Sequence, residues 1–583
     1  MRTGADILVR ALENENVELI FAYPGGANLE ILDCLRDSSV RIALSRHEQG
    51  AAHEASGYAR VSGKPGVCLA TSGPGATNLV TGIAAAYMDS VPLVVITGQV
   101  MVARVGTDAF QEVDVTGITG PITKHNYFIK DADSVARTVK EAFYIASSGR
   151  PGPVLIDFPR DIAGALSSVE SVQSINLRGY KPNLKGHAGQ IKQVVQLLSR
   201  SSRPVLIAGG GVIISGSWAE TLRLAENQQI PVASSMMGIG SVPFDHPLAL
   251  GMAGAHGLPA ANRAIQKSDL IIGLGTRFSD RLTCDTKSFA PHAKIVHIDV
   301  DPAEIGKNIR ADVPIVGDLR IVLGQLLEKL EPANRGEWLE EIAALKAAAY
   351  SATGAAGASD ASGVSRVAAS DASGVSGAAA SGASTARGLL PLRVMEAIGK
   401  AMPDDVIITS DVGQHQIWAA TGLPHRGPRR FISSGGLGAM GYGIPAAIGA
   451  MMASPGAPVL CVSGDGSFQM GLPELGTAAE QGLPLKILLI NNGSLGLVKQ
   501  LQDYYCDGRR TASAYSFNPD FGALIRAYGG GYYLAADEVT LAGVLPVFFA
   551  DDRLALLEVR VSGEENALPM VLAGDALDAM TGV

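Results

Sequence analysis

The segment APVLCVSGDGSFQ at residues 457–469 is the most informative about the fold of this 583-residue chain. An apolar, β-branched run is followed at once by Asp465, which stands between Gly464 and Gly466. This order is typical of a buried parallel strand that ends in a loop before a helix. In open α/β sheets, ligands bind at the carboxyl ends of the strands. The segment therefore predicts an α/β fold with a binding site at Asp465.

A second strand of the same kind, LKILLINN at residues 485–492, ends at Asn492. Asp465 and Asn492 each stand just past a strand, and together they offer two hard oxygen ligands suited to Mg²⁺. A magnesium ion held by so few protein oxygens completes its shell with water and substrate phosphates. A GDG turn alone is a common loop between strand and helix. The asparagine at the end of the next strand favours a metal and diphosphate site.

Strand-like runs alternate with helical stretches in three blocks, at residues 1–165, 190–345 and 389–560. The runs are VELIFAY, GVCLATS, PLVVITG and PVLIDFP in the first block, RPVLIAGGG, DLIIGLGTRFSD and KIVHIDVDP in the second, and DDVIITSDVG, APVLCVSGDG, LKILLINNG and LALLEVRVS in the third. This alternation predicts three α/β domains, each a doubly wound parallel sheet flanked by helices. Residues 561–583 form a C-terminal tail.

Residues 346–388, between the second and third blocks, consist almost wholly of Ala, Ser and Gly, and SDASGVS occurs twice, at 359–365 and 370–376. Too little apolar bulk is present to order such a stretch. We expect a flexible linker expanded by repeat slippage. A sensor or docking segment is the alternative.

Charge and composition exclude several classes of protein. The net charge is −9 and no long basic run is present, so nucleic acid is not an expected partner. No segment has the composition of a membrane span, and the N-terminus has helical apolar spacing after a cap at Thr3 where a signal peptide would be apolar throughout. The five cysteines are scattered without a CxxC pair, which is typical of reduced thiols in a cytoplasmic protein.

The order GDG, 24 residues, then NN resembles the signature of thiamine diphosphate (ThDP) enzymes. Further segments resemble one branch of them, the catalytic subunits of the acetolactate (acetohydroxyacid) synthases, over almost the whole chain except the linker. These segments are FAYPGGA (21–27), RHEQGAA (46–52), SGKPGVCLATSGPGATNLV (62–80), DSVPLVVITGQV (89–100), GTDAFQE (106–112), ITKHNY (122–127), RPGPVLIDFPRD (150–161), RFSDR (277–281), GQHQIW (413–418), SSGGLGAMGYGIPAAIGA (433–450) and EENALPM (564–570).

The resemblance implies decarboxylation of pyruvate on ThDP and condensation of hydroxyethyl-ThDP with a second 2-keto acid, pyruvate or 2-ketobutyrate. The products would be 2-acetolactate or 2-aceto-2-hydroxybutyrate, in branched-chain amino acid biosynthesis. Residues 1–165 would bind the ThDP pyrimidine, 190–345 FAD in a mainly structural role, and 389–560 the diphosphate with Mg²⁺. ThDP would lie between the first block of one subunit and the third block of another. The resemblance therefore implies a homodimer or tetramer, with a small regulatory subunit as a further partner.

Glu48 carries the catalytic role that the resemblance implies. It would hydrogen-bond the pyrimidine N1′, which favours the tautomer whose 4′-nitrogen removes the C2 proton. Met440 would support the bent shape of the cofactor. The residues expected to bind ThDP are Tyr23, Pro24, Gly25, Glu48, Thr71, Pro74, Asn78, Gly413, Gln414, His415, Gly438, Met440, Gly464, Asp465, Gly466, Ser467, Asn492, Ser494, Leu495 and Gly496. Asp465, Asn492 and Ser494 would hold Mg²⁺.

The resemblance also assigns the flavin and substrate residues. Those expected to bind FAD are Gly209, Gly210, Gly211, Gly254, His256, Gly275, Arg277 and Asp299. Those expected on the substrate side are Gly26, Phe110, Gln111, Lys124, Arg277 and Leu501. Residues 436–441 (GLGAMG) also fit GxGxxG, but no clear strand precedes them and no acid follows about 20 positions later, so we reject a dinucleotide fingerprint there.

Three positions depart from the family pattern. Leu501 replaces a tryptophan that helps the family prefer 2-ketobutyrate, Ala255 replaces a methionine and Arg160 a lysine. We expect a weaker preference for 2-ketobutyrate, since one changed apolar contact is worth ~1–3 kcal/mol of discrimination. The alternatives are a pyruvate oxidase-like enzyme or 2-keto acid decarboxylase of the same ThDP family, and a non-catalytic nucleotide-binding paralogue. Glu48, Asp465, Asn492 and Met440 favour a catalytic protein.

Overall fold

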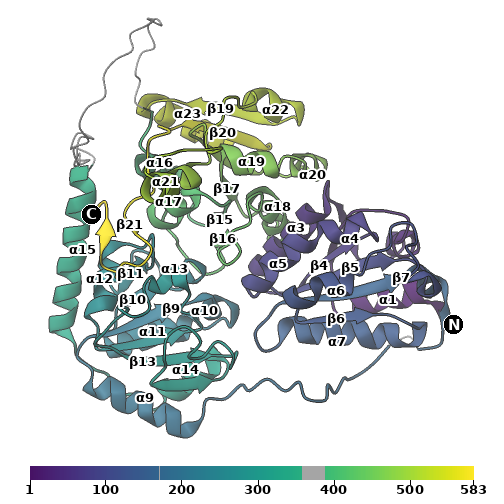
Figure 1. The fold of residues 1–583 in the computed structure, drawn as a ribbon, viewed down its shortest axis with the longest axis horizontal. Helices are drawn as coiled ribbons and strands as arrows, with labels where there is room; N and C mark the ends of the chain where they lie inside the picture. Colours follow the sequence, from purple (N-terminus) through teal and green to yellow (C-terminus); the bar gives the residue numbers. More distant parts are fainter. Residues whose placement is uncertain (170, 357–387) are drawn as a thin grey trace, which may run out of the picture.

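The computed structural model describes residues 1–169, 171–356 and 388–583. Three α/β domains follow one another along the chain, and each is built on a six-stranded parallel sheet (Figure 1). The predicted fold class is confirmed. The greater part of the expected linker, residues 357–387, lies outside the described residues.

The N-terminal domain has the strand order β3-β2-β4-β5-β7-β6. Its strands are β2 (Leu19–Ala22), β3 (Arg41–Leu44), β4 (Gly66–Ala70), β5 (Leu93–Gln99), β6 (His125–Phe128) and β7 (Pro153–Pro159). Its helices are α1 (Gly4–Asn14), α2 (Leu29–Arg36), α3 (Glu48–Ser62), α4 (Pro74–Asn78), α5 (Val80–Met88), α6 (Val115–Thr119), α7 (Val135–Ser147) and α8 (Arg160–Gly164). The side chain of Thr3 accepts the Asp6 N–H, which confirms the expected N-terminal cap.

The middle domain has the order β11-β10-β9-β12-β13-β14, so the strand order reverses between β9 and β12. Its strands are β9 (Pro204–Ala208), β10 (Val232–Ser234), β11 (Ala249–Met252), β12 (Leu270–Leu274), β13 (Lys294–Asp299) and β14 (Val313–Val316). Its helices are α9 (Ala188–Arg200), α10 (Gly210–Ile214), α11 (Trp218–Gln228), α12 (Pro259–Lys267), α13 (Asp280–Thr283), α14 (Leu319–Leu327) and α15 (Gly336–Ala356).

The C-terminal domain has the order β16-β15-β17-β18-β20-β19. Its strands are β15 (Ile407–Ser410), β16 (Phe431–Ser433), β17 (Val459–Gly464), β18 (Lys486–Asn491), β19 (Gly531–Ala535) and β20 (Ala555–Arg560). Its helices are α16 (Pro391–Ala401), α17 (Gln414–Gly422), α18 (Gly443–Ala453), α19 (Asp465–Met470), α20 (Glu474–Glu480), α21 (Gly496–Tyr505), α22 (Phe521–Ala527) and α23 (Glu538–Ala550). Strand β16 does precede residues 436–441, contrary to our expectation; with three residues it is too short for the pattern to reveal.

The ends of the predicted blocks differ from the structure in two places. Helix α15 continues to Ala356, past the expected start of the linker at residue 346, because alanine has the highest helix propensity. The C-terminal tail forms β21 (Met570–Val571) and β22 (Met580–Thr581) and packs on the middle domain (Figure 1). Its Leu577 is fully buried there. A further short pair, β1 (Arg2–Thr3) and β8 (Leu166–Ser167), closes the N-terminal domain.

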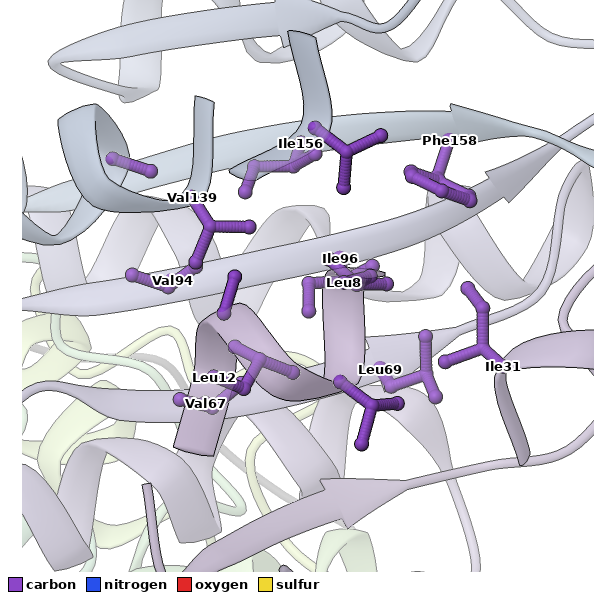
Figure 2. Close-up of a cluster of buried hydrophobic side chains, with 14 of the residues drawn as sticks. Leu8, Leu12, Ile31, Val67, Leu69, Val94, Ile96, Val139, Ile156 and Phe158 are labelled. Atoms are coloured by element: carbon purple, nitrogen blue, oxygen red, sulfur yellow. The ribbon is translucent and has the colours of Figure 1, made fainter. Parts of the chain in front are cut away.

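Each sheet is covered on both faces by apolar side chains, as parallel sheets require. In the N-terminal domain, α1 places Leu8 and Leu12 against Val67, Val94 and Ile156 of the sheet (Figure 2). In the other two domains, apolar side chains of the helices pack against buried strands in the same way. Among the described residues, no helix is long and apolar enough to span a membrane.

The N- and C-terminal domains meet where α3 crosses α18 (Figure 1). A Cβ atom added to Gly57 of α3 would lie 2.1 Å from the Ala446 carbonyl oxygen, and one on Gly449 of α18 would lie 1.9 Å from that of Glu54. The two helix backbones are therefore in direct contact, and each contributes a glycine. Beside this crossing, Arg60 pairs with the buried Asp89 at 2.5 Å.

Gly57→Ala should loosen this contact, because its methyl group meets backbone that side-chain rotation cannot move. We expect a lower midpoint of thermal unfolding, equivalent to about 1–3 kcal/mol of overpacking. Gly543→Ala in α23 is the matched control, since a Cβ there meets nothing within 4 Å. It should leave the midpoint unchanged or raise it. Equal midpoints for Gly57→Ala and the wild type would contradict the close helix contact.

Candidate active site

Glu48 is the first residue of α3, and its side chain is buried, with 7% of its surface exposed. Asn78 Nδ2 donates a hydrogen bond to Glu48 Oε2 at 2.9 Å. The other oxygen, Oε1, lies 3.3 Å from the position that a Cβ of Gly75 would take. An isolated glutamate in this pattern is typical of a solvated helix end, whereas here the carboxyl group faces the loop after β4. Glu48 is thus placed for use inside a site.

The loop after β2 meets the loop after β4 around Thr71. A Cβ on Gly25 would lie 2.5 Å from the Thr71 side chain, and one on Gly75 would lie 2.8 Å from it. The Thr71 hydroxyl accepts the Ala27 N–H at 3.2 Å. The expected ThDP residues of this domain therefore lie at the carboxyl edge of the sheet: Tyr23, Pro24 and Gly25 in the loop after β2, Thr71 in the loop after β4, and Pro74 and Asn78 at the two ends of α4.

Phe110 and Gln111 belong to a loop that packs on the same edge. Gln111 has φ of +60°, and its Cα lies 2.9 Å from the position of a Cβ on Gly73, so the two loops touch. The Phe110 side chain is 87% exposed, and Gly26 has open space where a Cβ would be. A phenylalanine side chain as exposed as Phe110 is available for contact with a substrate or a second chain.

Lys124 is held away from this group by other contacts. Its Nζ contacts the Ile145 carbonyl oxygen. It also donates to the Ser148 carbonyl oxygen at 2.8 Å and to the Tyr180 hydroxyl at 2.9 Å. Burial lowers the pKa of this amine to about 8. The ammonium group caps the C-terminal end of α7, where cations are favourable. These contacts support a structural role in place of the expected substrate contact.

Asp465 begins α19 at the end of β17, and only 1% of its surface is exposed. Burial raises the pKa of its carboxyl group to about 6, although Asn518 Nδ2 donates to Oδ2 at 2.8 Å. Burial removes the water that stabilises a carboxylate, and a nearby cation stabilises its charged form instead. The electrostatics of Asp465 therefore suit a bound metal ion.

Asn492 and Gln414 lie together beside this carboxylate. Asn492 Nδ2 donates to Gln414 Oε1 at 3.2 Å, and Asn492 Oδ1 accepts the Ser494 N–H at 3.1 Å. A Cβ on Gly496 would collide with both amides, so Gly496 makes room for the pair. The remaining expected residues of these loops, Gly466, Ser467 and Leu495, line the same strand ends; a Cβ on Gly466 would meet the Leu495 side chain.

Two buried polar atoms at these strand ends have no hydrogen-bond partner in the described part of the chain, His415 Nε2 and Ser494 Oγ. Burial lowers the pKa of His415 to about 3, so its ring is neutral. A Cβ on Gly413 would lie 2.8 Å from this ring and one on Gly464 would lie 2.7 Å from it, so both positions leave space for the imidazole. The Ser494 hydroxyl is an unpaired buried donor, and His415 Nε2 becomes a second donor when the ring takes up a proton, which the charge of a bound phosphate group favours.

No group of three His, Cys, Asp or Glu side chains able to hold a metal ion occurs within the described ranges. A single carboxylate with amide and hydroxyl oxygens is a donor set for Mg²⁺ that takes its other ligands from phosphate and water. Asp465, Asn492 and Ser494 thus fit magnesium together with a diphosphate.

Residues that the sequence patterns did not single out organise this half of the site. Asp411 is fully buried and accepts the N–H groups of Gly441 at 2.9 Å and Gly443 at 3.2 Å, which fixes the loop with Gly438 and Met440. Asn518 contacts Asp465, and Gln500 accepts from Gln414 Nε2 at 2.9 Å. The acid after β15 could have been found by the rule that located Asp465. Asn518 and Gln500 carry no comparable signal in a single sequence.

The expected flavin residues gather where the order of the middle sheet reverses. A Cβ on Gly209 would lie 2.1 Å from the Gly275 carbonyl oxygen, so the loops after β9 and β12 touch. Such a switch point is where doubly wound sheets bind dinucleotides. The expected flavin residues of this region are Gly209 and Gly275 in the loops after β9 and β12, Gly210 and Gly211 at the start of α10, Arg277 beyond β12 and Asp299 at the end of β13.

Gly254 and His256 belong to a neighbouring loop after β11. Asn262 exchanges two hydrogen bonds with the backbone of Gly254, at 2.9 and 3.0 Å. Burial lowers the pKa of His256 to about 4, and its Nδ1 has no hydrogen-bond partner among the described residues. Burial also raises the pKa of Asp299 to about 6. These polar groups fit a dinucleotide such as FAD.

The three departures from the family pattern lie in different surroundings. Leu501 is half-buried in α21, next to the buried Gln500. Ala255 is buried, and its carbonyl oxygen accepts the Val571 N–H of the C-terminal tail at 2.8 Å. Arg160 is exposed and pairs with Glu30 at 3.1 Å. Only Leu501 lies next to a residue that contacts the expected ThDP site.

Comparison with known proteins matches all three domains to thiamine pyrophosphate enzymes. The matches are the N-terminal TPP binding domain at residues 2–118, the central domain at 191–326 and the C-terminal TPP binding domain at 411–559. The chain is 45% identical to a probable acetolactate synthase large subunit of Methanocaldococcus jannaschii, over 98% of this chain and 94% of the relative.

Two further relatives show the same extent of similarity. Identity is 43% with the acetolactate synthase large subunit of Corynebacterium glutamicum, over 98% of this chain and 89% of the relative. It is 41% with the acetolactate synthase isozyme 3 large subunit of Escherichia coli, over 100% and 98%. With all three domains and nearly the full length matched, the chain belongs to the acetolactate synthase large subunit family of thiamine pyrophosphate enzymes.

Proposed function

We propose that this chain decarboxylates pyruvate and joins the remaining two-carbon unit to a second 2-keto acid, giving 2-acetolactate or 2-aceto-2-hydroxybutyrate. The observation that carries the proposal is the buried Glu48 carboxyl group, which accepts a hydrogen bond from Asn78 and lies against Gly75. ThDP, when bound, supplies the carbon nucleophile and the electron sink for this chemistry. Glu48 would share a proton with the pyrimidine N1′ and so activate the neighbouring amino group as a base.

Residues of the C-terminal domain would hold the other end of the cofactor. Asp465, Asn492 and Ser494 would bind Mg²⁺, and His415 would donate to the diphosphate. Met440, on the loop fixed by Asp411, would support the cofactor from below. FAD would bind in the middle-domain crevice near Arg277 and have a structural role.

The complete site would form between two chains, with Glu48 from one and Asp465 from the other. Exposed apolar side chains at both halves support this arrangement: Phe110 is 87% exposed, and Phe517 and Met470 of the C-terminal domain are 78% and 56% exposed. Large apolar side chains gain free energy when a second chain removes them from water. We therefore propose a homodimer as the minimal active unit. Relatives named large subunits support a small regulatory subunit as a further partner.

Glu48→Gln should lower acetolactate formation from pyruvate, ThDP and Mg²⁺ by about 10²–10⁴-fold, because general acid–base catalysis contributes that much. The measurement is product analysis, run with and without added FAD. Acetaldehyde or acetyl phosphate as the main wild-type product would indicate a decarboxylase or an oxidase instead. A wild-type chain that binds ThDP without turning over any 2-keto acid would favour the non-catalytic paralogue.

Chains carrying Glu48→Gln and chains carrying Asp465→Ala should regain activity when they are co-expressed with different tags. In a mixed dimer, one site receives both substitutions and the other receives neither. With random pairing, about a quarter of the wild-type activity should return, since half of the dimers are mixed and half of their sites are intact. Each variant expressed alone is the control. Mixed dimers as inactive as the parents would place both residues in a site within one chain.

Leu501→Trp should increase the preference for 2-ketobutyrate, because the larger aromatic surface contacts the extra methylene group of this substrate. A gain of ~1–3 kcal/mol corresponds to a 10- to 200-fold change in product ratio. Competition between pyruvate and 2-ketobutyrate, read as the ratio of the two products, measures it. Leu501→Met, which keeps an aliphatic side chain of similar volume, is the control and should leave the ratio unchanged. A wild-type ratio already strongly biased to the 2-ketobutyrate product would refute the role given to Leu501.

A further inference from the structure

Three residues, Ser45, Arg46 and His47, connect β3 to Glu48, and two buried carboxyl groups hold all three. Ser45 Oγ donates to Glu54 Oε2 at 2.5 Å. The Arg46 N–H lies 3.2 and 3.1 Å from the two oxygens of Glu474, and the His47 N–H donates to Glu474 Oε1 at 3.0 Å. The backbone immediately before Glu48 is therefore fixed by Glu474, a residue of the C-terminal domain.

The contact between Glu474 and this backbone is built into both elements. Glu474 is the first residue of α20 and is 2% exposed. A Cβ on Gly50 of α3 would lie 2.0 Å from Glu474 Oε1, so only glycine leaves space for the carboxylate. Thr477, one turn along α20, donates to Glu474 Oε2 at 2.6 Å and reaches the Leu44 carbonyl oxygen at 3.3 Å.

Glu54 faces Glu474 from α3 and is completely buried. Its Oε1 meets no hydrogen-bond donor within the described residues. Two buried carboxylates cannot both be charged at such proximity. Burial and the charge of Glu474 raise the pKa of Glu54 well above its ordinary value. Glu474 accepts two backbone N–H groups and a hydroxyl, whereas Glu54 accepts only the Ser45 hydroxyl, so Glu54 is the carboxyl group that keeps a proton.

We propose that Glu474 is a positioning residue for Glu48, and that the proton on Glu54 lets the two carboxyl groups hold residues 45–47 together. Glu474 acts through the backbone, because it accepts the N–H groups of the two residues before Glu48. The C-terminal domain of a chain thereby orients the catalytic glutamate of that same chain. This inference rests on the role proposed for Glu48 above.

The test measures exchange of the C2 proton of ThDP bound with Mg²⁺ in deuterated water, without substrate, by acid quench and NMR. Glu474→Gln should slow this exchange at least tenfold, because an amide oxygen holds the two N–H groups less strongly than a carboxylate. Glu54→Gln should exchange within twofold of the wild type, since its amide can donate to Glu474 and accept from Ser45. Glu54→Leu can do neither and should be slowed like Glu474→Gln.

Glu480→Gln is the matched control on the same helix. Glu480 pairs with the Arg46 side chain and makes no contact with the backbone of residues 45–47 in the described structure. It should leave the exchange rate unchanged, and the thermal midpoints of all variants are compared in parallel. If Glu474→Gln does not fold, Gly50→Ala replaces it, because its methyl group displaces the same carboxylate.

The positioning role would be overturned if Glu474→Gln exchanged the C2 proton at the wild-type rate. It would also be overturned if Glu480→Gln slowed the exchange as much as Glu474→Gln. If Glu54→Gln slowed the exchange as much as Glu54→Leu, the role given to the proton on Glu54 would be overturned. A wild-type chain that exchanges the C2 proton and forms no acetolactate would refute the proposed function alone. The two hypotheses therefore fail on different measurements.

Discussion

The direct contact between the backbones of α3 and α18 determines how the rest of the structure can be arranged. Gly57 and Gly449 allow it, since a Cβ on either would overlap a carbonyl oxygen of the other helix. The contact joins the first and third domains across nearly 400 residues of sequence. Because α3 also begins with Glu48, the joint between the domains fixes the direction from which the glutamate enters its site.

Charged side chains that are buried near this contact need partners, because they have lost their contact with water. Arg60 and Asp89 form an ion pair there, and the Asp89 carboxylate also accepts the Gly435 and Gly436 N–H groups at 3.2 and 2.6 Å. Glu54, which faces Glu474, has no such ion pair; burial and the neighbouring Glu474 raise its pKa, so it keeps a proton. An uncompensated buried charge would cost several kcal/mol, and Asp89 and Glu474 each accept N–H groups from the other domain. Domain contact and site geometry thus depend on the same side chains.

Much of the fold was predictable because its strands are buried on both faces and read as continuous apolar runs. Asp465 and Asn492 could be located because each follows such a run directly. The linker start was misplaced because the alanines of residues 346–356 extend α15, and β16 was missed because a three-residue strand leaves no pattern. Lys124 illustrates another limit: its sequence neighbours could not reveal the carbonyl oxygens of α7 that surround its amine.

The three α/β domains, the family resemblance and the strand-end positions of the polar residues depend on local order along the chain, so the amino-acid sequence is enough to predict them. The burial of Glu48 against Gly75 and Asn78 and the contact of Glu474 with the backbone before it appear only in the folded protein. Glu474 and Glu48 are far apart in sequence, and no local pattern records which distant carboxylate accepts a given N–H group. Such contacts arise only when the domains pack, because burial then requires each polar group to find a partner.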